Sequence, residues 1–303
     1  MDEMIQEVIY GRIKGINSSD NMYNILVEVS DKTTVNIKTK LPGTAFTIGR
    51  IYKFLVASYP NTERNIRFMI EHTLASNLED SDEADMVYRM FDNKCPYTKQ
   101  ELEAKIEAYL EKIKNPVISE VTRCVLKEHS HFFYIYPAAQ RFHHNYVGGL
   151  AYHTLGMLDL AMALGMQFPY LDMDYLYAGV ILHDMAKVME FSGIENTEYT
   201  LEGQLLGHLV VGSEWIRAKA KELGYEQREE VLLLMHMVAS HHGQQAFGAC
   251  KRPQTPEALM LWYIDTIDSK FRVLGEELDK TEPGKFTDSI GVLEKTRIYK
   301  KKD

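Results

Sequence analysis

Hydrophobic residues alternate with polar ones over roughly the first 75 positions and then follow a helical period from about Leu78 onward. Within the first stretch, turn signals such as NSSDN, LPG and YPNTE separate segments rich in Val, Ile, Tyr and Phe. The pattern predicts five β-strands, at 7–16, 23–31, 33–40, 49–59 and 65–73. Five strands in so short a segment favour a small barrel, preferably an OB-fold, with an SH3-like barrel as the alternative because the pattern does not fix the strand connections.

The remainder of the chain is predicted to be helical. Thr98 and Glu101 have the spacing of a capping box, at the start of a helix that ends before Pro116. Thr255 and Pro256 likewise mark the start of a long last helix. Further helices are predicted at 148–165, 174–189, 201–224 and 226–242. The sequence therefore predicts a two-domain protein with an all-β barrel at 1–75, a helical spacer at 76–116 and an all-α domain at 117–303.

Composition is that of a globular protein, with 303 residues of which 45% are hydrophobic and 25% charged. Apolar runs do not reach the ~18 residues of a membrane span, and the N-terminus MDEMIQEVIYGR lacks the layout of a signal peptide. We therefore expect a cytoplasmic protein without a membrane partner.

The charge is unevenly distributed. The net charge of −9 argues against a protein that coats nucleic acid with a basic surface. Residues 1–75 hold nine Lys and Arg against eight Asp and Glu, whereas the rest holds 25 against 35. A polyanion would bind more easily to the barrel or to the tail KTRIYKKKD, and the acidic remainder would need cations to accept a phosphate.

Histidines give the main functional signal. Ten of the eleven lie between His129 and His242, and several interrupt apolar runs, as in VILHDMAK. Any single one of them is more simply explained as a core polar residue satisfied by a neighbour. Together, however, five predicted helices each bring an imidazole or a carboxylate to an apolar face, which favours a shared divalent cation. The candidate ligands are His153, His183, Asp184, His208, His241 and Asp265.

The order of these residues resembles that of the HD-domain superfamily of metal-dependent phosphohydrolases. By that resemblance, the first metal would be held by His153, His183, Asp184 and Asp265, and a second by Asp184, His208 and His241, so that Asp184 bridges both. His242 remains an alternative to His241. Asp268 fits a surface pair with Arg272 as well as it fits a ligand role.

Two such cations suit hydrolysis of a phosphate ester. Lys187 follows Asp184 by three residues, so its ammonium either pairs with Asp184 or reaches a phosphate oxygen; a lysine that only extends to solvent is the alternative. Asp184 and Lys187 are the candidate catalytic residues. Arg141, His143 and His144, which precede the helix of His153, could line the substrate together with His242.

A closer resemblance, to one group within this superfamily, indicates the class of substrate. The segments HHNYVGGLAYHTLGML, AGVILHDMAKVMEF, GQLLGHLVVG and SHHGQQAFGACKRPQTPEALMLWYIDTIDSKF are similar to those of the YhaM-type 3′–5′ exoribonucleases of Gram-positive bacteria. This resemblance is strong from about Pro137 to Phe271 and covers the barrel only in layout. It implies hydrolysis of single-stranded RNA, with single-stranded DNA as a further candidate substrate, to nucleoside monophosphates with two divalent ions. Manganese or magnesium is expected, and iron, cobalt or zinc is compatible with the ligands.

Two other functions are also compatible with the sequence. One is an HD phosphohydrolase for a small nucleotide, such as a dinucleoside polyphosphate or a cyclic dinucleotide, in which the barrel regulates the enzyme or forms a homo-oligomer. The other is a nucleic-acid-binding sensor without turnover, for which a missing ligand would be the sign. The sequence lacks none of the ligands.

Overall fold

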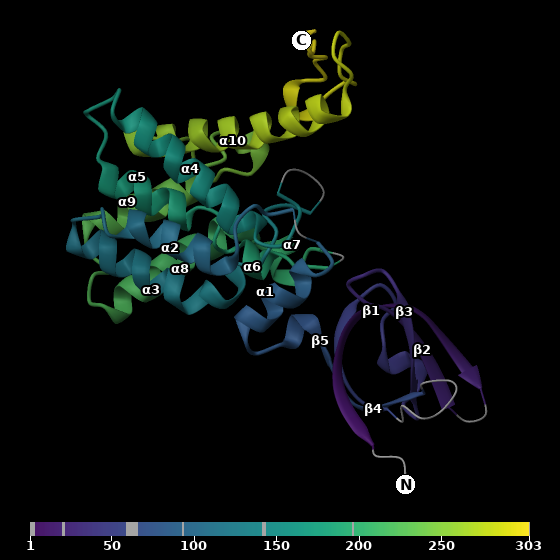
Figure 1. Ribbon diagram of the computed structural model, residues 1–303. Coiled ribbons are helices and arrows are strands. Elements are labelled where there is room, and N and C mark those ends of the chain that lie inside the picture. Colours follow the sequence, from purple (N-terminus) through teal and green to yellow (C-terminus); the bar gives the residue numbers. More distant parts are fainter. Residues whose placement is uncertain are drawn as a thin grey trace. The chain divides into compact units, whose positions relative to one another are not determined.

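The computed structural model describes residues 4–19, 22–58, 66–92, 94–140, 144–195 and 197–302 (Figure 1). The chain divides into two compact units, Met1–Lys94 and Cys95–Asp303. The first unit holds the strands, and the second holds the segment between His129 and His242 that carries most of the histidines.

The first unit is a closed barrel in which the strands follow the order β1-β2-β3-β5-β4 around the wall. The strands are β1 (Ile5–Ser19), β2 (Met22–Glu28), β3 (Thr34–Thr39), β4 (Ile51–Ser58) and β5 (Arg67–Leu74). Neighbouring strands are antiparallel except β3 and β5, which are parallel. Alternate side chains such as Ile13, Ile25 and Ile37 point inward and are fully buried. The five strands predicted from the alternating pattern are confirmed.

Among the described residues of the barrel unit, one α-helix accompanies the strands. Helix α1 (Ser81–Arg89) begins after Asp80, whose side chain accepts a hydrogen bond from the backbone N–H of Asp82. The carboxylate of Glu83 on this helix accepts a hydrogen bond from Tyr10 at 2.6 Å and pairs with Lys53 at 2.7 Å. These contacts attach α1 to β1 and β4.

The second unit is helical throughout its longer elements. Its helices are α2 (Lys99–Leu110), α3 (Pro116–Phe133), α4 (Gly149–Gly165), α5 (Met173–Leu182), α6 (Lys187–Glu190), α7 (Leu201–Leu205), α8 (Gly207–Glu222), α9 (Glu229–Ser240) and α10 (Pro256–Lys280). Short 3₁₀ helices lie at Gln245–Phe247 and Gly291–Leu293 in this unit, and at Gly43–Ala45 and Ala75–Asn77 in the first unit. The predicted capping box of Thr98 and Glu101 starts α2, and the side chain of Thr255 caps α10. A helical domain after a five-stranded sheet is thus confirmed.

Helix α5 is the centre of this unit, since it packs against α3, α4, α9 and α10. Every residue from Leu176 to Leu182 is buried. The segment is apolar on all sides, as expected of a helix surrounded by other helices. The polar residues that follow Leu182 therefore emerge in the interior of the unit rather than at its surface.

Two predicted helices are interrupted, and both interruptions lie at the candidate site. The helix predicted at 174–189 ends at Leu182, and i→i−3 hydrogen bonds follow, such as the bond from the Lys187 N–H to the Asp184 carbonyl at 3.0 Å. The helix predicted at 201–224 breaks before Gly207, which has a φ of 71°. The apolar pattern continues through both interruptions, so the periodicity alone does not reveal them.

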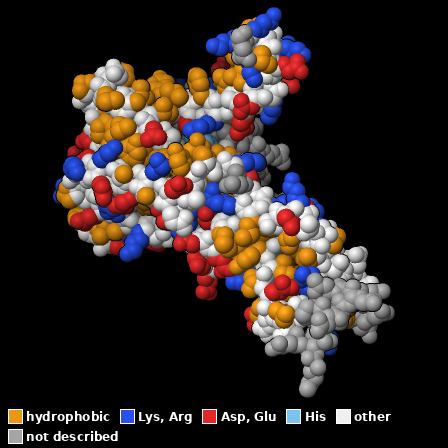
Figure 2. Space-filling view, viewed as in Figure 1, with side chains coloured by type: hydrophobic (Ala, Val, Ile, Leu, Met, Phe, Trp, Pro, Cys, Tyr) orange, Lys and Arg blue, Asp and Glu red, His pale blue; other side chains and the backbone are white. Residues whose placement is uncertain are grey.

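The surface of the helical unit carries side chains of both charges. On the face in Figure 2, Lys and Arg side chains are interspersed with Asp and Glu side chains. Within the described part of the chain, no helix is both long and apolar enough to cross a membrane.

Candidate metal centre

The predicted ligands converge in the interior of the helical unit although they come from distant parts of the chain. They arise from α4, from the turn after α5, from the start of α8, from the end of α9 and from α10. The four predicted histidine ligands and Asp184 are buried, the most exposed being His208 at 7%, and Asp265 is half-buried. Burial of so many ionisable groups is costly unless they share a partner.

Asp184 is the central residue of the group. Its Oδ1 lies 3.3 Å from Nε2 of His208 and 3.5 Å from Nε2 of His241. Its Oδ2 lies 3.2 Å from Nε2 of His183 and 3.8 Å from Nε2 of His153. Each carboxylate oxygen therefore faces its own pair of imidazoles, and the two pairs are the two that the resemblance implied.

Two of the four imidazoles are oriented by their own helices. Nδ1 of His183 donates a hydrogen bond to the carbonyl of Val180 at 2.7 Å, and Nδ1 of His241 donates to that of Val238 at 2.8 Å. Each histidine stands at a helix end, where carbonyls lack an intrahelical partner. A carbonyl only accepts, so Nδ1 carries the proton in both rings and the lone pair of each neutral ring lies on Nε2.

Carboxylates orient the other two imidazoles. Nδ1 of His153 lies 2.7 Å from Oδ2 of Asp268, and Nδ1 of His208 lies 2.8 Å from Oε2 of Glu190. A carboxylate behind a histidine fixes the ring and increases its basicity, which is the usual outer arrangement around a metal. All four rings thus use Nδ1 for an outward bond and direct Nε2 toward Asp184.

Several of the inward atoms lack a hydrogen-bond partner within the described residues. They are Nε2 of His183, His208 and His241 and Oδ1 of Asp184, all buried. Buried polar atoms are rarely left in this state, because the loss of water is then uncompensated. Imidazole nitrogens and carboxylate oxygens are ligands of divalent cations, and the sets His153, His183, Asp184 and His208, His241, His242 are close enough to hold one. The residues present therefore fit a metal centre.

Asp265 completes the half of the centre that contains His153. Its Oδ1 lies 3.5 Å from Nε2 of His153. Asp265 also lies one turn before Asp268 on α10, so the same helix supplies a carboxylate to each nitrogen of this ring.

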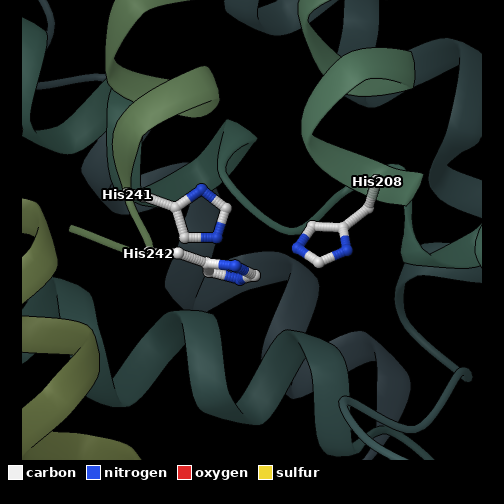
Figure 3. A group of neighbouring side chains, drawn as sticks. All are labelled: His208, His241 and His242. Carbon is white, nitrogen blue, oxygen red and sulfur yellow. The ribbon is translucent and has the colours of Figure 1, made fainter. Parts of the chain in front are cut away.

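His242 lies beside the other half. Its ring centroid is 4.5 Å from that of His241 and 5.1 Å from that of His208, and the three rings face a common space (Figure 3). His241 is fully buried and faces Asp184, whereas His242 is half-buried. This placement agrees with His241 as the inner ligand and with His242 nearer the approach to the site.

Lys187 contacts the bridging carboxylate. Its Nζ lies 2.6 Å from Oδ2 of Asp184, because the i→i−3 turns between the two residues bring side chains three positions apart over one another. Burial would lower the pKa of Lys187, but attraction to Asp184 outweighs that effect and raises it. The lysine is therefore charged and its ammonium pairs with Asp184, while 18% of the side chain remains exposed.

Two carboxylates give His153 negatively charged surroundings. Burial would lower the pKa of His153, but its interactions with Asp265 and Asp268 prevail and raise the pKa to about 9. Burial would raise the pKa of Asp268, but hydrogen bonds from His144 and His153 hold it well below its usual range. The surroundings thus favour positive charge at this position.

Only some of the residues predicted to line the substrate are among the described residues. Arg141 and His143 lie outside the described residues. His144 is 1% exposed, with Nδ1 at 2.8 Å from the Tyr146 hydroxyl and Nε2 at 3.1 Å from Asp268. Both ring nitrogens therefore have partners, and the buried ring faces Asp268.

Two carboxylates that support ligands are missing from the set predicted by sequence. The sequence pattern suggests Asp268 only as a partner of Arg272 or as a ligand, and it does not single out Glu190. Glu190 nevertheless shows the signal that identified the histidines, a charged residue within the apolar segment VMEF. Applied to glutamates as well as to histidines and aspartates, that criterion finds Glu190.

Comparison with protein families matches residues 150–270 to the HD domain. The match spans all six predicted ligands, from His153 to Asp265. HD domains bind divalent metals and are typically metal-dependent hydrolases, which agrees with the convergent histidines and carboxylates. The match therefore supports the HD-domain superfamily for this segment of the helical unit.

Proposed function

We propose that this protein is a metal-dependent phosphodiesterase that removes nucleoside monophosphates from the 3′ end of single-stranded RNA. The observation that carries the proposal is the division of the Asp184 carboxylate between two imidazole pairs whose Nε2 atoms all point inward. Such an arrangement suits two cations that share one carboxylate.

The chain's own residues have distinct tasks in this proposal. His153, His183 and Asp265 would hold one ion, and His208 and His241 the other, with Asp184 shared by both. When bound, the two ions supply Lewis-acid activation of a water molecule and of the phosphoryl group. The charged Nζ of Lys187, already adjacent to Asp184, would hold a phosphate oxygen in position.

The barrel supports RNA as the substrate. A five-stranded closed barrel with β5 between β3 and β4 is the arrangement we associate with an OB-fold, whose β2–β3 face commonly binds oligonucleotides. A groove lies on this face and is lined by polar and basic side chains, namely Asn24, Thr34, Asn36, Lys38 and Arg67, together with Val35 and Ile66. Amides and cations of this kind suit contacts to phosphate and to base edges.

The proposal is tested by incubating the protein with Mn²⁺ and a 5′-labelled single-stranded RNA. We expect a ladder that shortens from the 3′ end, and no shortening by Asp184→Ala. An oligonucleotide whose 3′ end is blocked should be degraded more slowly if the enzyme is an exonuclease. Intact RNA together with rapid hydrolysis of a dinucleoside polyphosphate or a cyclic dinucleotide would instead establish the small-nucleotide phosphohydrolase.

A second assay separates RNA capture from chemistry. The double variant Lys38→Ala/Arg67→Ala removes the cations of the groove, so it should slow RNA degradation while leaving hydrolysis of bis(p-nitrophenyl) phosphate unchanged. The matched control Lys14→Ala/Lys32→Ala removes two cations of the same barrel that do not line the groove. Equal effects of the two double variants on RNA would contradict a role for the groove.

A further inference from the structure

We propose that Asp268 is a positioning residue for His153, held in place by His144 and by the absence of a side chain at Gly156. The inference rests on the proposed metal function, because it assigns a task to a residue that supports one of the ligands. It explains how the ring of His153 is oriented in its half of the metal centre.

Asp268 has all the contacts that this task needs. It is 5% exposed, and its Oδ2 lies 2.7 Å from Nδ1 of His153 and 3.1 Å from Nε2 of His144. Its Oδ1 lies 3.3 Å from Nε of Arg272. The carboxylate therefore accepts from three cationic or polar donors and is compensated despite its burial.

His144, His153 and Asp268 are also close enough to form a small metal site of their own. Proton positions argue against that use. A neutral imidazole has one lone pair, and Nε2 of His153 faces Asp184 and Asp265. If Nε2 binds a cation, Nδ1 must carry the proton, and Asp268 is the group that accepts it.

The backbone of His144 indicates that its ring position is imposed. His144 has a φ of 57°, a left-handed conformation that residues other than glycine adopt at a cost. A Cβ at Gly149 would lie 2.0 Å from the carbonyl oxygen of His144, so only glycine allows this close approach. The strained residue directs its Nε2 to Asp268 and its Nδ1 to Tyr146.

Gly156 gives independent support from the other side of the carboxylate. It lies inside α4, where glycine is less favourable than alanine. A Cβ at this position would lie 2.9 Å from Oδ1 of Asp268 and 3.2 Å from Nη2 of Arg272. The glycine therefore leaves room for the Asp268 carboxylate, and a methyl group there would displace it from His153.

The test compares Asp268→Asn and Gly156→Ala with the wild-type protein by titrating each with Mn²⁺ and recording its circular dichroism and thermal unfolding without metal. We expect each variant to bind one of the two ions about 10–100-fold more weakly, with wild-type helical content. Turnover should recover at saturating Mn²⁺, because the defect lies in ligand placement. The control is Asp159→Asn. Asp159 lies on the same face of α4 as Gly156, and its carboxylate accepts a hydrogen bond from Tyr109 and not from a histidine. This variant should bind both ions as the wild type does.

The Gly156→Ala variant keeps the test decisive even if Asp268→Asn fails to fold, since it removes no charged group. Wild-type affinity for both ions in a folded Gly156→Ala or Asp268→Asn variant would overturn the inference. A wild-type protein that binds no ion would overturn the proposed function first, and the inference with it. The two failures are thus distinguishable in one set of titrations.

Discussion

The turn after His241 and His242 offers a sharp test of how the site is held, through the substitution Gly243→Ala. Gly243 has a φ of 72°, and a Cβ placed on it would lie 2.0 Å from Cε2 of Trp262 on α10. The substitution therefore has two costs, a left-handed backbone for alanine and a collision with an indole ring that must move.

The structure supplies a matched control at Gly224, which has a φ of 76° and no neighbouring atom within 4 Å of the position that a Cβ would take. Gly224→Ala should lose only the backbone contribution, about 1–2 kcal/mol of unfolding free energy. Gly243→Ala should lose that contribution and a further overpacking cost of about 1–3 kcal/mol. The difference between the two variants thus isolates the contact with Trp262.

Urea unfolding measures both losses. Tryptophan emission measures the displacement, since the chain has two tryptophans and a Trp215→Phe background leaves Trp262 as the reporter. Gly243→Ala should shift the emission and weaken metal uptake, and Gly224→Ala should do neither. Equal losses of stability with unchanged emission from both variants would refute the reasoning.

Three further variants test the same geometry. Glu190→Gln should weaken binding of the ion at His208 by about 10–100-fold in a metal titration, and wild-type affinity would contradict the support assigned to Glu190. Lys187→Met should retain metal uptake but lower kcat at saturating metal by about 100-fold, because it removes the cation that holds the phosphate oxygen, so unchanged kcat would exclude this task for Lys187. Ile25→Ala removes a fully buried side chain of the barrel and should destabilise it by about 2–5 kcal/mol in urea unfolding, while metal uptake should remain that of the wild type because the ligands lie in the other unit.

Much of the candidate site could be predicted because the signal was local. A histidine or an aspartate within an apolar run, as in VILHDMAK, is costly wherever the run is buried. Five such interruptions in separate helices therefore indicate one shared centre from the sequence alone. The same logic did not reach Asp268, because its i+4 spacing to Arg272 offered a sufficient local explanation.

Local sequence patterns set the periods of the two parts, five strands followed by helices, and identify the residues whose burial requires a partner. The orientation of those residues depends on contacts between distant parts of the chain. Which nitrogen of each ring points inward depends on a carbonyl or carboxylate behind it, and the carboxylate behind His153 is 115 positions away in the chain. Such long-range pairs arise from the packing of α4 against α10, which periodicity along one helix cannot specify.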